Sequence, residues 1–207
     1  MTDRDLVRLH WPLELRAAFD ALFAIDDALG EVVASSTQPA LGAIRLAWWR
    51  EALERLDASP PPPEPRLQAV ARELLPRGIS GSMLAGLEEG WADLVDETPD
   101  MLLVEERGTR LFALAARLLG VEFEDVTLGT AGRLFARADA ARRRMVDLLA
   151  ASPSSGRLKI ARKVRPLTGL AALAARDLRR GGPPFEPEAS PARAWTLLRH
   201  RLFGTIS

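Results

Sequence analysis

The segment Arg45-Leu46-Ala47-Trp48-Trp49-Arg50-Glu51 follows one short loop after Ile25-Asp26-Asp27-Ala28-Leu29-Gly30-Glu31, and these two stretches decide the fold. Adjacent residues of a helix point about 100° apart, so a helix with Trp48 next to Trp49 presents large apolar side chains in two directions. We therefore expect this helix to be enclosed on two sides, with at least one of the tryptophans in the core. The other tryptophan either joins the same core or lines a cavity.

Apolar residues recur at helical spacing along nearly the whole chain, and no stretch shows the strict alternation of a half-buried strand. The pattern predicts an all-α protein, with Gly120 as one helix stop and a kink or break at Pro166. The expected helices cover approximately residues 13–33, 39–56, 67–75, 82–95, 101–119, 127–151, 158–180 and 191–203. The length of 207 residues predicts a single domain, 1–207, in which residues 58–65 form a proline-rich exposed spacer and residues 152–156 a loop.

The composition excludes several classes of protein. The chain has no cysteine, so it forms neither disulfides nor thiolate metal sites. No apolar stretch approaches the roughly 20 residues that span a bilayer, and no apolar signal core follows the first residues, so we expect a cytoplasmic location. The only histidines, His10 and His200, are too far apart in sequence to suggest a metal set or a catalytic triad. No nucleotide-binding fingerprint is present.

The net charge of zero hides an asymmetry between the two parts of the chain. Residues 1–132 hold 12 basic and 23 acidic side chains, a net of −11, whereas residues 133–207 hold 16 basic and 5 acidic side chains, a net of +11. Either the two parts pack together and complement each other, or the basic part binds anions at the inner membrane face. The second reading predicts weak, salt-sensitive association with anionic vesicles. Nucleic acid is not an expected partner, because aliphatic residues rather than stacking aromatics lie between these arginines.

Three parts of the sequence resemble the squalene/phytoene synthase family. They are Ala24-Ile25-Asp26-Asp27 with residues 45–53, residues 111–120 followed by Gly129-Thr130-Ala131-Gly132, and the tail Leu198-Arg199-His200-Arg201-Leu202. The resemblance implies a truncated, single-domain helical bundle of the isoprenoid synthase type. The Arg/Trp segment also looks like that of a respiratory complex I assembly factor that carries a phytoene synthase-like domain.

Enzymes of this family are implied to join two prenyl diphosphates after Mg²⁺-assisted loss of diphosphate, inside an apolar tunnel. That chemistry needs acidic clusters on two facing helices, because carboxylates hold the hard Mg²⁺ ions around the diphosphate. Asp26, Asp27 and Glu31 would form the first cluster, since Asp27 and Glu31 share a helix face. Alternatively, the two aspartates cap or solvate a helix edge or pair with Arg45.

The second cluster departs from the family pattern. The resemblance predicts two aspartates four residues apart after Gly132, whereas this chain has Asp139 alone and Arg143 in the place of the second carboxylate. The arginine run 142–144 would repel Mg²⁺, although it could hold a phosphate directly. Glu89, Asp93 and Glu97 either replace the lost cluster or form a solvated helix face.

These observations favour a squalene/phytoene synthase-like protein without Mg²⁺-dependent prenyl transfer and without a cofactor. It would bind an isoprenoid or other lipid, or act as an assembly protein with a protein partner and a weak association with a membrane surface. The alternative is an active prenyltransferase that uses Mg²⁺ through Asp26, Asp27, Glu31 and Asp139. The candidate residues of the ligand pocket are Phe23, Arg45, Trp48, Trp49, Phe112, Arg133 and Arg137.

Overall fold

The computed structural model describes residues 1–206 apart from 96–97, 123–125, 144, 147–156 and 182, and most of them are helical. The prediction of an all-α protein is therefore confirmed, with one small addition, a two-stranded sheet. The elements are α1 (Asp3–Arg8), η1 (Leu13–Leu15), α2 (Arg16–Ser35), α3 (Pro39–Arg55), α4 (Pro65–Glu73), η2 (Leu75–Arg77), α5 (Gly81–Ala85), α6 (Glu88–Ala92), η3 (Asp93–Val95), α7 (Met101–Leu118), α8 (Val126–Arg142), β1 (Leu158–Lys159), η5 (Arg162–Val164), α9 (Arg165–Arg179), α10 (Pro191–Phe203) and β2 (Thr205–Ile206), where η marks a 3-10 helix. No helix in the described ranges is both long and apolar enough to cross a bilayer.

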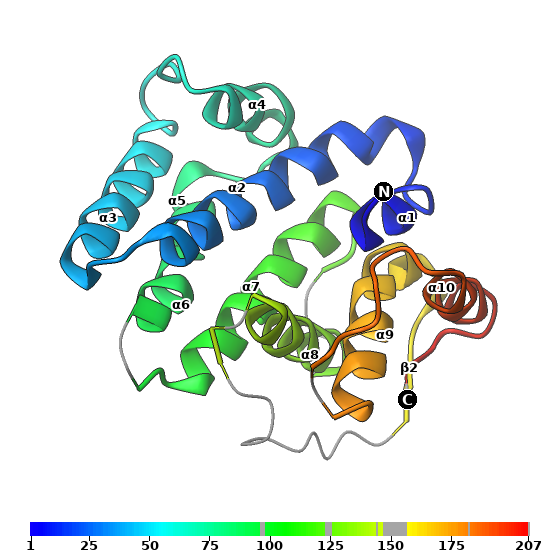
Figure 1. The fold of residues 1–207 in the computed structure, drawn as a ribbon. Coiled ribbons are helices and arrows are strands. Elements are labelled where there is room, and N and C mark those ends of the chain that lie inside the picture. The colour runs from blue at the N-terminus through cyan, green and yellow to red at the C-terminus, as the bar shows by residue number, and fades with distance from the viewer. Residues whose placement is uncertain (96–97, 123–125, 144, 147–156, 182, 207) are drawn as a thin grey trace.

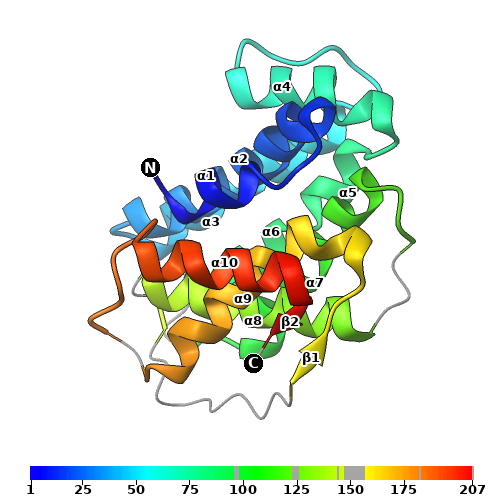
Figure 2. The same cartoon turned by 90° about the vertical axis from the view of Figure 1, so that its right-hand side faces the viewer.

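The helices pack around one continuous cluster of buried apolar side chains. Helix α8 lies between α7 and α9, α2 crosses the molecule beside α7, and α3 and α10 lie at opposite ends (Figure 1). The view turned by 90° shows α10 lying across the near side, over α9 and next to α1 (Figure 2). The first and last helices of the chain are therefore neighbours.

Helices α7 and α8 approach each other closely through two glycines. A Cβ atom on Gly108 would overlap the backbone carbonyl of Gly132, and a Cβ atom on Gly132 would overlap that of Gly108. Only glycine removes this obstacle on both helices. The close approach brings the side chains that follow on α8 next to those of α7.

The expectation that α3 is enclosed on two sides is wrong. Trp49 is buried at 7% exposure, but Trp48 is 49% exposed and packs edge-on against the Trp49 ring, with centroids 5.2 Å apart. Helix α3 lies at the edge of the molecule, where α2, α5 and α6 cover only one side of it. Leu41 and Ile44 consequently share the exposed side with Trp48.

Several predicted helix boundaries also change. The predicted helix 82–95 is broken into α5, α6 and η3, where Gly86 and Gly90 weaken a continuous helix. Residues 158–159 form β1, which pairs antiparallel with β2 rather than starting a helix. Pro166 does not kink α9, because it lies in the first turn, where the missing N–H group has no helical partner to lose.

The remaining predictions hold to within a few residues or fall outside the described ranges. The last helix, Pro191–Phe203, matches its prediction. Gly120 stops the chain from continuing as a helix two residues after the end of α7, and its φ is 63°. Pro65 opens α4 and so does not belong to the spacer. Helix α8 ends at Arg142, and the end of the predicted helix 127–151 and the loop 152–156 lie outside the described residues.

Candidate functional site

Alternating acids and bases connect α2 with α7 and α8 in the interior of the bundle. We call this set the aspartate–arginine cluster, and it consists of Asp26, Asp27, Asp139, Arg4, Arg107 and Arg143. Two of the aspartates come from α2 and one from α8, so acids from facing helices do converge, as the resemblance implies. The arginines between them come from α1, α7 and the residue that follows α8.

Asp26 and Arg107 form the buried end of the cluster. Asp26 is 0% exposed, and Arg107 Nη1 donates to its Oδ1 at 2.8 Å and to its Oδ2 at 3.0 Å. Trp91 Nε1 also donates to Oδ1, at 2.9 Å, and the Arg107 guanidinium lies 3.8 Å from the centroid of the Trp91 ring. Burial raises the pKa of the Asp26 carboxyl, and the positive charge of Arg107 opposes this rise.

The cluster continues from Arg107 towards the surface. Arg107 Nη2 donates to Asp139 Oδ2 at 3.1 Å, and Arg143 Nε donates to Asp139 Oδ1 at 3.1 Å. Arg143 Nη2 then donates to Asp27 Oδ1 at 2.7 Å, and Arg4 binds the same carboxylate through both of its terminal nitrogens. Burial alone would raise the pKa of Asp27, but Arg4 and Arg143 outweigh it, so that this pKa is lowered.

The donor chemistry of the cluster does not fit a Mg²⁺ site. Each of the six carboxylate oxygens accepts a hydrogen bond from a guanidinium group. The three negative charges are balanced by three positive charges, and guanidinium nitrogens carry no lone pair for a metal. Across the described part of the chain, no group of three acidic or histidine side chains has an arrangement that could hold a metal ion.

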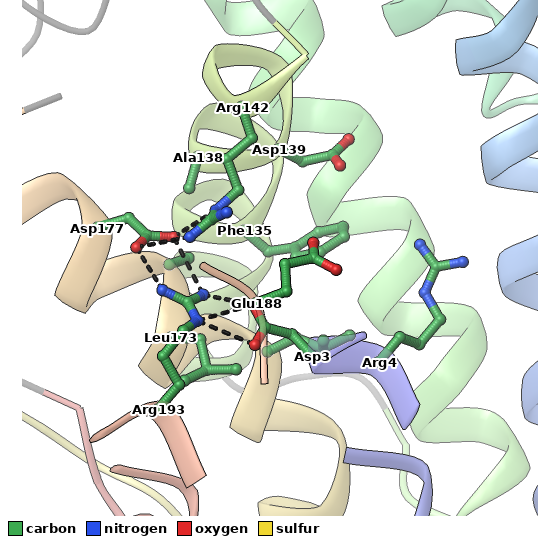
Figure 3. A pocket seen from close by; sticks show the side chains of 12 residues that line it. Asp3, Arg4, Phe135, Ala138, Asp139, Arg142, Leu173, Asp177, Glu188 and Arg193 are labelled. Carbon is green, nitrogen blue, oxygen red and sulfur yellow. Dashed lines mark hydrogen bonds and ion pairs between the residues drawn. The ribbon is translucent and has the colours of Figure 1, made fainter. Parts of the chain in front are cut away.

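Two hollows border the cluster, a small one of mixed polar and apolar lining and a larger, open one. A cavity of about 80 Å³ lies between α1, α8 and α9. In Figure 3, Arg142 and Arg193 lie on either side of the Asp177 carboxylate, and Arg193 also binds Asp3. Ligand pockets generally measure about 300–1,000 Å³, so this cavity does not admit a prenyl chain. An open cleft of about 530 Å³ borders Asp27 and Asp139, but all the described side chains that line it are polar or charged.

The predicted pocket aromatics belong to the core. Phe23 and Phe112 are buried, and both contact Phe135, with ring centroids 6.2 and 5.6 Å away. They fill the centre of the bundle instead of lining a tunnel. Trp49 is likewise a core residue, whereas Trp48 lies on the outer side of α3.

Other predicted site residues lie away from the cluster. Glu31 forms an exposed ion pair with Arg66 at 2.7 Å, so it does not act with Asp27. The alternative that Arg45 pairs with the aspartates is wrong, because Arg45 Nη1 donates to the hydroxyl of Ser35 on the outside of the molecule.

The remaining candidates on α6 and α8 make contacts of other kinds. Arg133 is exposed and donates to Thr130, and Arg137 forms an ion pair with Glu105 at 3.2 Å. Neither residue is among the described side chains around the 80 Å³ cavity. Of the substitute acids, Glu89 binds Arg110 at 2.7 Å, and Glu97 lies outside the described residues.

Sequence reasoning missed Arg4, Trp91 and Arg107. The signal for Arg107 was present, because it occupies a position on the apolar face of α7 between Val104 and Leu111, where an uncharged residue is the norm. A charged residue at such a position needs a buried partner of opposite charge. Nothing comparable marks Arg4, which precedes the first apolar run.

The two oppositely charged parts of the chain complement each other at specific pairs. Arg143 binds Asp27, Arg193 binds Asp3, and Arg137 binds Glu105, so that basic residues after position 132 meet acids before it. The reading in which the parts pack together is therefore confirmed for these pairs. Comparisons of the chain with protein-family models, curated proteins and solved structures gave no match.

Proposed function

We propose that the protein is a non-catalytic relative of the squalene/phytoene synthases that acts by binding other molecules through its surface. The observation that supports this most strongly is the occupation of all six oxygens of Asp26, Asp27 and Asp139 by guanidinium donors. The proposal assigns the arginines a structural role, in which they join α2 to α7 and α8 without a metal.

The family assignment is part of this proposal. It is supported by the Asp26-Asp27 pair on α2, by the Arg/Trp segment on α3 and by the convergence of acids from α2 and α8. In a metal-dependent synthase of this kind the facing acids would hold Mg²⁺ and a diphosphate. Here Arg143 binds Asp27 and Asp139 together, and so replaces the bridging cation.

An assembly role has better support than the storage of a lipid in the cavity beside the aspartate–arginine cluster. The cavity of about 80 Å³ is too small for an isoprenoid, whereas α3 exposes Leu41, Ile44 and Trp48 at 53%, 66% and 49%. These residues are three and seven apart and form one apolar stripe on the helix. Such a stripe on an outer helix suits a protein partner with an apolar surface of its own.

One observation favours the alternative, an active prenyltransferase. Asp27 and Asp139 border the open cleft of about 530 Å³, so a substrate could reach one side of the cluster. Catalysis would require Arg4 and Arg143 to leave these carboxylates before Mg²⁺ could bind. The two ion pairs are partly exposed, with side-chain exposures of 27% and 22% for the arginines, and this exposure makes the alternative testable.

The test is to incubate the purified protein with farnesyl or geranylgeranyl diphosphate and Mg²⁺. Hydrocarbon product, diphosphate release and the melting temperature are measured together. We expect no turnover. We also expect no shift in melting temperature, since a ligand that bound the folded state would raise the melting temperature by mass action. Turnover that disappears in Asp27→Ala but persists in Asp20→Ala, an exposed aspartate on the same helix, would refute the proposal.

A further inference from the structure

The outer side of α10 is apolar although it faces solvent. Trp195, Leu198 and Leu202 are 66%, 44% and 61% exposed. They are spaced by three and four residues and therefore form one stripe along the helix. The opposite side of α10, which includes Thr196, Leu197 and His200, is buried in the protein. The packing of α10 on the protein core therefore does not account for the apolar residues on its solvent-exposed side.

Arginines surround this stripe. On a helix with about 100° per residue, Arg199 and Arg201 fall on either side of the line through Trp195, Leu198 and Leu202. The stripe continues at Leu202 into a cleft of about 510 Å³, which is also lined by His10, Arg162, Arg165 and Arg201. No carboxylate is among the described side chains that line this cleft.

The positive charge of this region is not balanced locally. Helix α10 contains no acidic residue, and within the described ranges no ion pair joins Arg162, Arg199 or Arg201 to a carboxylate. Burial and then the nearby charge of Arg201 lower the pKa of His10. Burial and then Arg199 likewise lower the pKa of Arg179. These arginines therefore differ from those of the aspartate–arginine cluster, where every guanidinium binds an aspartate.

We propose that this side of the molecule, the α10 surface formed by Trp195, Leu198, Leu202, Arg162, Arg199 and Arg201, docks onto an anionic lipid bilayer. A bilayer surface supplies both kinds of contact at once, since its acyl boundary accepts the tryptophan and leucines while its phosphates accept the arginines. Association with a second copy through the same surface would bring Arg199 and Arg201 close to the same arginines of the other copy. This contact between like charges disfavours self-association.

The α10 surface is separate from the features used for the proposed function. Helix α10 lies at the opposite end of the molecule from α3, so docking through α10 does not require α3 to contact the lipid (Figure 1). The aspartate–arginine cluster contributes no residue to it. A failure of membrane binding would consequently leave the proposal of a non-catalytic protein unaffected.

The experiment is flotation of the 207-residue protein with vesicles of phosphatidylcholine, with and without about 30% phosphatidylglycerol. We expect binding to the anionic vesicles alone, and weaker binding at high salt. A surface arginine contributes roughly five-fold to such partitioning, so Arg199→Ser combined with Arg201→Ser should reduce it about 30-fold. Trp195→Ser should reduce it about ten-fold, through loss of apolar contact with the lipid. Leu202→Ser provides a second apolar variant, in case Trp195→Ser lowers the melting temperature.

Matched controls come from α3, which carries the same residue types in exposed positions. Arg50→Ser combined with Arg55→Ser, and separately Trp48→Ser, should leave vesicle binding unchanged. Tryptophan fluorescence gives an independent measurement, because Trp195 is the most exposed of the five tryptophans. Anionic vesicles should shift the emission to shorter wavelength in Trp48→Ser but not in Trp195→Ser.

Several results would overturn the proposal. Equal binding to neutral and anionic vesicles would show that the arginines do not contribute to binding. A loss of vesicle binding in the α3 control variants as large as that in the α10 variants would show that the α10 surface is not the docking surface. Sedimentation that shows a dimer dependent on Trp195, without vesicle binding, would assign the stripe to self-association. Binding of inorganic phosphate that depends on Arg201, again without vesicle binding, would identify a site for soluble anions instead.

Discussion

Replacement of Arg107 by methionine tests whether the aspartate–arginine cluster stabilises the fold as a set of charges. Methionine keeps most of the apolar volume of the side chain but leaves the Asp26 carboxylate, at 0% exposure, with Trp91 as its remaining donor. Removal of one partner of a buried ion pair costs about 3–5 kcal/mol. Because domains of this size are stable by only about 5–15 kcal/mol, Arg107→Met should lose a large part of the free energy of unfolding.

A double-mutant cycle with Asp26→Asn separates charge from packing. Asparagine still accepts the hydrogen bond from Trp91 but carries no charge, so Arg107→Met should cost about 2 kcal/mol less in the Asp26→Asn background than in the natural protein. The measurement is urea denaturation followed by circular dichroism. The control is Arg55→Met on α3, where the pair with Glu51 is exposed at 74% and 56%, and it should stay within about 0.5 kcal/mol of the natural protein.

The pH dependence of the same variant provides a further check. Burial raises the pKa of Asp26, and loss of Arg107 must raise it further, so the variant can relieve the buried charge by binding a proton. The cost of Arg107→Met should therefore be smaller at acidic than at neutral pH. If the variant loses less than about 1 kcal/mol at neutral pH, or loses the same amount with Asp26→Asn, the charged pair does not stabilise the fold.

Two further predictions concern the packing of α7 and the histidines. Gly132→Ala should lower the free energy of unfolding by about 3 kcal/mol, because its Cβ atom would overlap the carbonyl of Gly108. Gly86→Ala, where the new atom makes only ordinary contacts, is the control and should lie near zero in the same urea titration; equal losses in both would contradict the packing argument. Burial lowers the pKa of His10 and His200, so the folded state binds protons less readily than the unfolded chain. The melting temperature should accordingly fall as the pH drops from about 7 to 5, and His200→Gln should reduce this fall; an unchanged slope would count against a buried neutral His200.

The spacing of apolar residues in the sequence was sufficient to predict most of the helices. Wherever a helix packs on one side, the residues buried on that side recur with the period of the helix. The prediction from this spacing failed for α3. The adjacency of Trp48 and Trp49 predicts two apolar directions, but the sequence does not say how many neighbours a helix has. At the edge of the molecule the second direction faces solvent. Local sequence also did not show that residues 158–159 pair with 205–206, since that contact joins distant segments.

The candidate site was predicted in part. The resemblance directed attention to Asp26, Asp27 and Asp139, and the structure brings all three together. Their partners could not be identified in the same way, because Arg4 and Arg107 meet these acids across 23 and 81 residues of sequence. Only the three-dimensional packing decides which arginine reaches which carboxylate. The one local clue was the charge of Arg107 within an apolar helix face.

The ion pairs of Arg193 have a consequence for the order of events during synthesis. Its guanidinium needs Asp3 and Asp177, and the first of these partners lies 190 residues earlier in the chain. A ribosome that adds roughly 5–20 residues per second takes about 10–40 seconds to cover that interval. Until α10 emerges, the Asp3 carboxylate of the nascent chain lacks its arginine partner, although α1 can already pack on α9. The ion pairs that join α1 to α10 should therefore form only after α10 has been synthesised.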